Sequence, residues 1–127
     1  MPEPMLTKVH EDARGEMYAI VLPSGKEILL IHSKAGALRG GHHHTYGERV
    51  LMLEGEAHYS RMLGLAKLSE HIGEGDARST PAGQLHMAEF PVDTWLIEMK
   101  LGMPDGTWKT EDHEPWRKRV RASANGG

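Results

Sequence analysis

Residues 36–55 read GALRGGHHHTYGERVLMLEG, and this stretch contains three consecutive histidines followed by a glutamate. In an extended strand the side chains alternate between two faces, so His42 and His44 would share one face and His43 would lie on the other. Glu48 follows at an even spacing, and a turn just before it would return it on an adjacent strand. Imidazole and carboxylate groups in this arrangement are typical ligands of a divalent transition metal.

A second stretch supplies a further candidate ligand. His86 follows a turn at residues 81–83 and lies on an expected strand over residues 84–90. We therefore expect one metal ion held by His42, His44, Glu48 and His86. The chain has no cysteine, so thiolate ligands are excluded. These donors favour Mn, Fe, Co, Ni or Zn over Ca or Mg, and they leave positions for water or substrate.

The rest of the chain is typical of an all-β protein with many short strands. Fifteen glycines and seven prolines punctuate short apolar runs, and residues 94–101 alternate apolar and polar side chains with a period of two. We expect a hairpin that joins residues 16–22 to 27–33, and a second hairpin with its corner at residues 54–55. The spacing of the runs predicts an antiparallel β-barrel or sandwich. The further expected strands cover residues 6–10, 51–53, 56–62 and 68–72.

The composition divides the chain into a barrel and a tail. A length of 127 residues predicts one domain. We assign the barrel to residues 1–105, with its core at about 16–101, and a polar basic tail to residues 106–127. The tail is either solvated or forms a short helix at residues 115–122, since Trp108 and Trp116 favour a docked segment.

Charge and hydropathy exclude several classes of partner. The net charge of −3 argues against nucleic-acid binding, and acidic residues interleave the basic ones of the tail. No apolar run is long enough to span a bilayer, and the N-terminus lacks a secretory signal, so we expect a soluble cytoplasmic protein without a membrane partner. Leu29, Leu30 and Ile31 occupy both faces of one strand. At least one must face away from the interior, which together with exposed sheet edges predicts a homodimer.

The two stretches resemble the two motifs of the cupin superfamily. The first motif, G-x5-H-x-H-x3-E-x6-G, has its fixed positions at Gly36, His42, His44, Glu48 and Gly55. The second, G-x5-P-x-G-x2-H-x3-N, is matched by Gly75, Pro81, Gly83 and His86, whereas Phe90 stands where the motif has Asn. The resemblance implies an antiparallel jelly-roll barrel over about residues 16–101, with the metal inside its mouth.

A weaker similarity concerns one branch of the superfamily. Asp12, Arg14 and Gly15, together with Arg39 and Gly40, resemble positions in sugar-nucleotide ketoisomerase and epimerase cupins. Those relatives often work without metal, through a histidine base. The full ligand set departs from that habit and favours a metal-dependent member.

The resulting hypothesis is a metal-dependent enzyme of the isomerase, dioxygenase or decarboxylase type, acting on a small polar molecule. His58, on the strand that returns from residue 55, is the candidate acid or base because it would face the cavity. Arg39 would pair with a carboxylate or phosphate, and Gln84 and Met52 would contact the substrate. The alternatives are a non-catalytic cupin that binds or senses a small ligand, and a metal-free sugar-nucleotide isomerase or epimerase.

Overall fold

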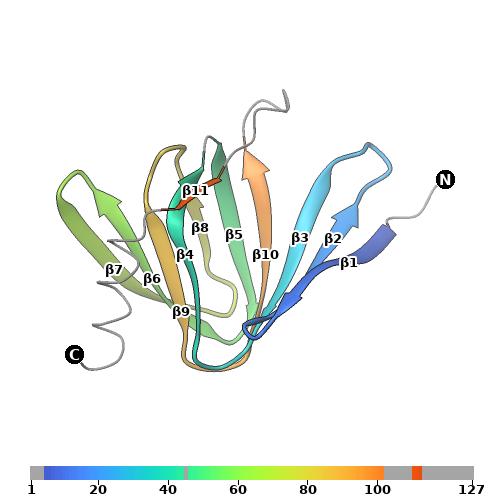
Figure 1. Ribbon diagram of the computed structural model, residues 1–127, viewed down its shortest axis with the longest axis horizontal. Coiled ribbons are helices and arrows are strands. Elements are labelled where there is room, and N and C mark those ends of the chain that lie inside the picture. Colours follow the sequence, from blue (N-terminus) through green and yellow to red (C-terminus); the bar gives the residue numbers. More distant parts are fainter. Residues whose placement is uncertain (1–4, 45, 102–109, 113–127) are drawn as a thin grey trace.

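The fold consists of two antiparallel β-sheets that face each other (Figure 1). The computed structural model describes residues 5–44, 46–101 and 110–112, with only the backbone for 42–44 and 110–112. Eleven strands lie in these residues. The six-stranded sheet has the order β1 (Met5–Asp12), β2 (Gly15–Val21), β3 (Glu27–Ser33), β10 (Thr94–Leu101), β5 (Gly47–Glu54) and β8 (Ala77–Thr80). The five-stranded sheet has the order β11 (Thr110–Asp112), β4 (Ala37–His44), β9 (His86–Phe90), β6 (Glu56–Leu63) and β7 (Ala66–Gly73). The predicted all-β, antiparallel class is confirmed.

One predicted hairpin is confirmed and the other is wrong. β2 pairs with β3 around the expected turn, from Val21 opposite Glu27. By contrast, β5 pairs with β10 and β8, while β6 pairs with β7 and β9, so the chain changes sheets at Gly55. Gly55 has a φ of 99°, and a Cβ there would lie 2.4 Å from Thr94 Oγ1. The glycine therefore forms a tight corner against the start of β10 instead of a hairpin turn.

The core lies between the inner faces of the sheets. The predicted alternation along β5 is confirmed, because Glu48, Val50 and Met52 are buried. Apolar side chains from both sheets complete the buried cluster: Ile31, Ala37, Val50, Met52, Ala57, Tyr59, Ile72, Phe90 and Leu96. Within this sandwich, polar side chains gather toward the end at which β5 begins, and this gathering defines the site described below.

The outer face of the six-stranded sheet is also apolar. Tyr18, Leu30, Ile97 and Leu51 lie in register on neighbouring strands, and all four are half-buried. The prediction that at least one of three consecutive residues in β3 faces away from the interior is confirmed for Leu30. Whether a second copy of the chain covers this face stays a prediction.

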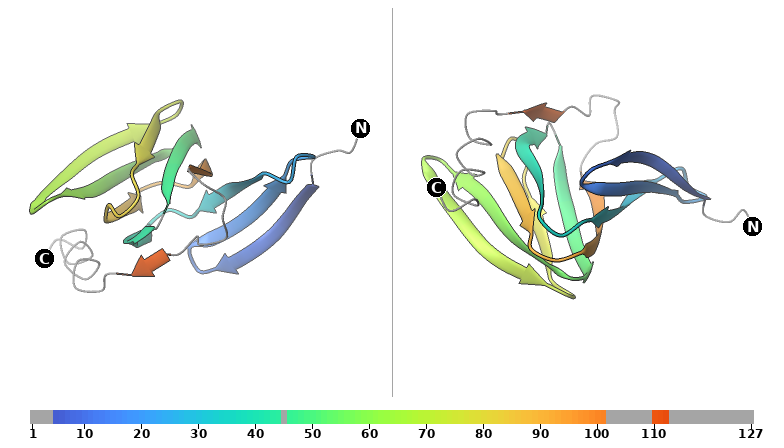
Figure 2. Two further views of the ribbon diagram at one scale, coloured as in Figure 1. Left: turned by 90° about the horizontal axis from the view of Figure 1, so that it is seen from above. Right: turned by 60° about the horizontal axis from the view of Figure 1, so that its bottom comes forward.

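The two ends of the chain have different settings. The predicted edge strand at residues 6–10 is confirmed as part of β1, which is exposed along almost its whole length. Figures 1 and 2 show β1 and β2 on the side of the molecule away from β6 and β7. Residues 110–112, within the predicted tail, form β11 and pair with β4. The predicted helix at residues 115–122 lies outside the described residues, and the boundary at residue 105 stays a prediction.

Among the described residues, no helix has the length and apolar character needed to cross a membrane.

Candidate metal centre and cavity

Two of the four predicted metal ligands are in contact. His86 on β9 and Glu48 on β5 come from opposite sheets, and His86 Nε2 lies 3.0 Å from Glu48 Oε1. Both residues are buried, with 5% and 3% of their surface exposed. His86 Nδ1 also lies 3.0 Å from the carbonyl oxygen of Gln84. When the Nδ1–H group donates a hydrogen bond to that carbonyl, Nε2 carries no proton and presents its lone pair to Glu48.

Such a contact joins two acceptor atoms, so it requires a proton or a cation between them. Two ligands that bind one divalent ion at about 2.1 Å, at nearly a right angle, are themselves about 3 Å apart. The spacing of the His86 and Glu48 atoms is therefore the spacing expected of two ligands of one metal. The donor set is chemically suited to the transition metals named above.

The backbone brings the other two predicted ligands close to this pair. His42 on β4 is the register partner of His86 on β9, and His44 lies two residues further along β4. The register of β4 shifts between Gly40 and His42, which is a β-bulge. A Cβ at Gly40, whose φ is 94°, would lie 2.8 Å from the His86 carbonyl oxygen. Glycine thus lets β4 approach β9 at the site.

The complete four-ligand set stays a prediction. The side chains of His42 and His44 are not among the described atoms, and the described side chains by themselves contain no cluster of three metal-binding groups. What the structure adds is that His86 and Glu48 converge, and that the backbone of His42 runs beside them.

Glu98 is a site residue that the sequence argument missed. It lies on the inner face of β10, where it lines the cavity and is hydrogen-bonded to Glu48. Burial, and then the negative charge of Glu48, raise the pKa of Glu98 well above its usual range. Both effects favour the protonated form of Glu98, which can donate a hydrogen bond to Glu48. The sequence did contain a signal for Glu98. It is two residues from Leu96, which is apolar and faces inward, and residues two apart on a strand share a face.

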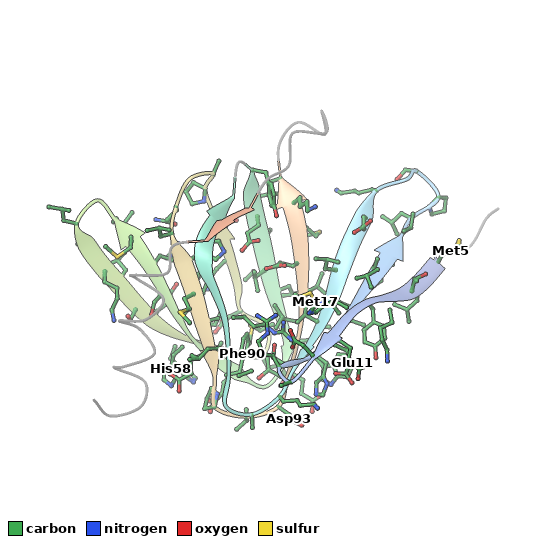
Figure 3. The ribbon with its side chains drawn as sticks, viewed as in Figure 1. Met5, Glu11, Met17, His58, Phe90 and Asp93 are labelled. Atoms are coloured by element: carbon green, nitrogen blue, oxygen red, sulfur yellow. The ribbon has the colours of Figure 1, made fainter. Side chains whose placement is uncertain are left out.

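Tyr59 is the second missed residue, and it corrects the prediction for His58. Tyr59 is buried, its hydroxyl is hydrogen-bonded to Thr80 Oγ1, and its ring centroid lies 6.3 Å from that of His86. Burial raises the pKa of Tyr59 above its ordinary value, so the phenol stays protonated. His58, labelled in Figure 3, is exposed and contacts His71 instead. The prediction that His58 faces the cavity is wrong, because its neighbours in β6 occupy the inward positions.

These groups line a cavity of about 470 Å³ between the sheets. Its wall combines the polar groups of Glu48, Glu98, Tyr59 and His86 with apolar side chains that include Met52, Ile31 and Phe90. Met52 thus lies where the sequence argument expects a ligand contact. A second hollow of about 700 Å³, beside the β2–β3 turn and the end of β10, shares Tyr46, Glu48 and Glu98 with the first. The two carboxyl groups therefore stand on the wall between the two hollows.

Arg39 lies on the cavity wall, and its guanidinium is held from one side. Nε donates to Ser33 Oγ at 2.6 Å and Nη2 donates to the His32 carbonyl oxygen at 3.2 Å, which ties β4 to β3. The remaining nitrogen, Nη1, is buried without a hydrogen-bond partner. Burial lowers the pKa of Arg39 from its ordinary value, and the positive charge of Arg14 lowers it further. The guanidinium still keeps its charge at neutral pH.

Gln84 is hydrogen-bonded to the backbone, and Phe90 belongs to the hydrophobic core. Gln84 Nε2 donates to the Met62 carbonyl oxygen at 3.1 Å, and Gln84 is not among the residues that line either hollow. The structure therefore does not place Gln84 where the predicted substrate contact would need it. Phe90, at the position where the second motif has Asn, is buried in the core.

The comparisons with known proteins bear on the fold. No protein-family model matches the chain. The DNA damage-repair/toleration protein DRT102 of Arabidopsis thaliana is 29% identical over 99 residues, which cover 75% of this chain and 30% of that protein. The capsular polysaccharide assembling protein CapF of Staphylococcus aureus superimposes with a TM-score of 0.71 at 21% identity, over 85% of this chain and 32% of CapF.

Two further structures have the same fold. Vicilin from hazelnut, Corylus avellana, gives a TM-score of 0.70 at 12% identity, over 83% of this chain and 34% of vicilin. The CENP-C cupin domain of Drosophila melanogaster gives 0.64 at 12% identity, over 76% of this chain and 75% of that domain. The present chain thus spans about a third of DRT102, CapF and vicilin.

The two facing sheets and the buried polar cluster inside them define a jelly-roll protein with an internal site. Its fold is the cupin fold, and the fold that the resemblance of the two sequence motifs implied is confirmed.

Proposed function

We propose that this cupin binds one divalent transition metal, Mn, Fe, Co, Ni or Zn, through His42, His44, Glu48 and His86. In this proposal the metal-bound protein is an enzyme that acts on a small polar molecule in the cavity between the sheets. The reaction is of the isomerase, dioxygenase or decarboxylase type.

One observation carries this proposal, the 3.0 Å contact between His86 Nε2 and Glu48 Oε1 inside a cavity of about 470 Å³. The cavity is large enough for a small-molecule ligand. The fold does not decide the activity, because the same fold supports many functions.

The chain's own residues would act in separate ways. A bound cation would supply Lewis-acid polarisation of an oxygen of the ligand. Glu98 lines the same cavity beside Glu48, so its carboxyl group is positioned to exchange a proton with a bound molecule. Tyr59 remains a neutral hydrogen-bonding group next to His86. The apolar wall, which includes Met52, limits the water around these groups and so strengthens their electrostatic interactions.

The same contact also favours a second function, that of a metal-free sugar-nucleotide isomerase or epimerase. A proton between His86 and Glu48 would give the same spacing as a metal, and a histidine oriented by a carboxylate is a common general base. In this version EDTA leaves the activity intact, whereas His42→Ala or His44→Ala removes it. Activity that follows the metal content would exclude it.

The primary test is elemental analysis of protein purified without a histidine tag from metal-replete cells. We expect about one equivalent of a transition metal per chain, as one four-ligand site requires. Less than about a tenth of an equivalent would contradict the metal site. Incubation with small polar metabolites then separates an enzyme from a binding protein. Recovery of a bound ligand unchanged after long incubation with metal-loaded protein would identify a binding or sensing cupin.

A further inference from the structure

Arg39 is a buried cation that forms no ion pair within the described part of the chain, and the carboxylates of Asp12, Glu98 and Glu16 act on it only from a longer distance. Only 8% of its surface is exposed, and Nη1 has no hydrogen-bond partner. Its two acceptors, Ser33 Oγ and the His32 carbonyl oxygen, are neutral. Among the described residues, no carboxylate lies within ion-pair distance of Arg39. A buried charge without a partner is costly, so its retention at a cavity wall indicates an interaction with a ligand.

The nearest cation on the cavity wall is already neutralised. Arg14 Nη2 lies 2.6 Å from Asp12 Oδ2, and Arg14 Nε also donates to both oxygens of that carboxylate. The carboxylate of Asp12 therefore opposes the effect of the Arg14 charge on Arg39. This region of the cavity is left with a single positive charge, that of Arg39.

We propose that the ligand of this cavity carries one carboxylate group, which binds Arg39 through Nη1. This inference rests on the proposed function, because the ligand is the small polar molecule that occupies the same cavity. A single carboxylate matches the single unpaired charge. A phosphate dianion would leave excess negative charge in a cavity that already contains Glu48 and Glu98.

The shape of the guanidinium agrees with a planar acid group. Nε and one proton of Nη2 are committed to β3, so the free protons are the two on Nη1 and the second on Nη2. An oxygen pair that approaches the end of the guanidinium can accept from both terminal nitrogens, which is a usual geometry for a carboxylate. The neighbouring wall is apolar, with Met17, Leu38 and Phe90, and it would contact the carbon atoms of the acid.

The experiment is an NMR titration of the full chain with butyrate, butyramide and inorganic phosphate, in EDTA-treated and in zinc-loaded protein. We expect butyrate to give saturable shifts of the Arg39 Nε–H and Gly40 N–H signals. Butyramide and phosphate should bind at least about tenfold more weakly, because a hydrogen bond to a charged group is the stronger one. Equal affinity for butyrate and butyramide, or no shift with any probe, would overturn the inference.

Two variants separate a ligand contact from a purely structural role. Arg39→Gln should weaken butyrate binding by at least about tenfold, whereas Arg78→Gln should change it by less than about threefold, because Arg78 pairs with Glu70 and does not line the cavity. If Arg39→Gln does not fold, Ser33→Ala provides the test, since it removes one contact of the tie to β3 and keeps the charge. Retained butyrate binding in Ser33→Ala supports the inference, and its loss together with intact folding contradicts it.

A comparison of EDTA-treated with zinc-loaded protein distinguishes a failure of the carboxylate site from a failure of the metal site. Zinc binding without any effect of butyrate at Arg39 would overturn the carboxylate site and leave the metal site standing. Butyrate binding at Arg39 in protein that binds no metal would overturn the proposed metal-dependent function alone.

Discussion

The two ends of the cavity differ in charge, because carboxyl groups line one end and a guanidinium lines the other. Glu48, Glu98 and His86 lie together at one end, where Glu98 is hydrogen-bonded to Glu48 and His86 contacts Glu48. Arg39 lies at the other end, bonded to Ser33, which pairs with Thr94 at the start of β10. Glu98 is four positions after Thr94 along β10, which corresponds to about 13 Å of strand. The first end therefore gathers carboxyl and imidazole groups, whereas the second presents a guanidinium that forms no ion pair with any described residue.

This difference shows how one cavity can select a ligand with two distinct groups. A metal would complete the end with the carboxyl groups, and an anionic group of the ligand would complete the end with Arg39. Arg39 and Glu98 attract each other across the cavity, but within the described part of the chain they do not form an ion pair. Substitutions at each end should therefore have separable effects.

The largest effect should come from the carboxylate and histidine end. Either Glu48→Ala or His86→Ala removes one predicted ligand and should weaken metal affinity by at least about 100-fold. Competition with a chelating dye measures this loss. His58→Ala is the matched control, because His58 is an exposed histidine on the outer face, and it should leave the affinity unchanged. Equal metal binding by His86→Ala and the wild type would contradict the site.

A smaller effect should come from Glu98, and its size depends on the replacement. Glu98→Gln keeps a hydrogen-bond donor next to Glu48, so the free energy of unfolding of metal-free protein should change by less than about 1 kcal/mol. Glu98→Leu leaves the buried Glu48 without that donor and should cost about 1–3 kcal/mol. Urea unfolding in EDTA measures both. The opposite order of stability would show that the hydrogen bond between Glu98 and Glu48 does not stabilise the fold.

Ile97, the residue before Glu98, tests whether the two faces of β10 act independently. Ile97 lies beside Glu98 in the chain but belongs to the apolar row on the outer face, with Leu30 and Leu51. Ile97→Lys should leave metal and butyrate binding within about twofold and convert a dimer to a monomer, because a charge would then be buried in the interface. Sedimentation velocity measures the change. Wild-type protein that sediments only as a 14.1 kDa species at micromolar concentration would contradict the predicted homodimer.

The smallest effect should come from the ion pair between Asp12 and Arg14. Hydrogen bonds from Arg14 and His10 hold the pKa of Asp12 well below its ordinary value of 3.8. A lowered pKa in the folded state stabilises the fold above the ordinary pKa, and this contribution is lost as the pH falls further. Asp12→Asn should therefore be less stable than the wild type at pH 6 by a few tenths of a kcal/mol, since the pair is partly exposed. The difference in urea midpoints should shrink at about pH 3. A difference that grows on acidification would contradict this assignment.

Local patterns predicted much of the fold and part of the site. The strands expected at residues 27–33 and 94–101 have the same bounds as β3 and β10. Alternation placed Glu48, Val50 and Met52 on one face, and the motif spacing selected Glu48 and His86, which are in contact. These features could be predicted because each depends on neighbouring residues, or on a short spacing that a turn preserves.

The sequence alone therefore determined an antiparallel β fold of the cupin type and a pair of converging metal-ligand candidates. The tertiary structure decided that Gly55 is a corner between sheets, that Tyr59 and not His58 faces the cavity, and that Glu98 lies against Glu48. It also showed that Arg39 is buried and forms no ion pair with any residue that the structure describes. The physical reason is that these features depend on how distant strands pair and face one another, and a single shift of register or sheet reverses the face that each side chain occupies.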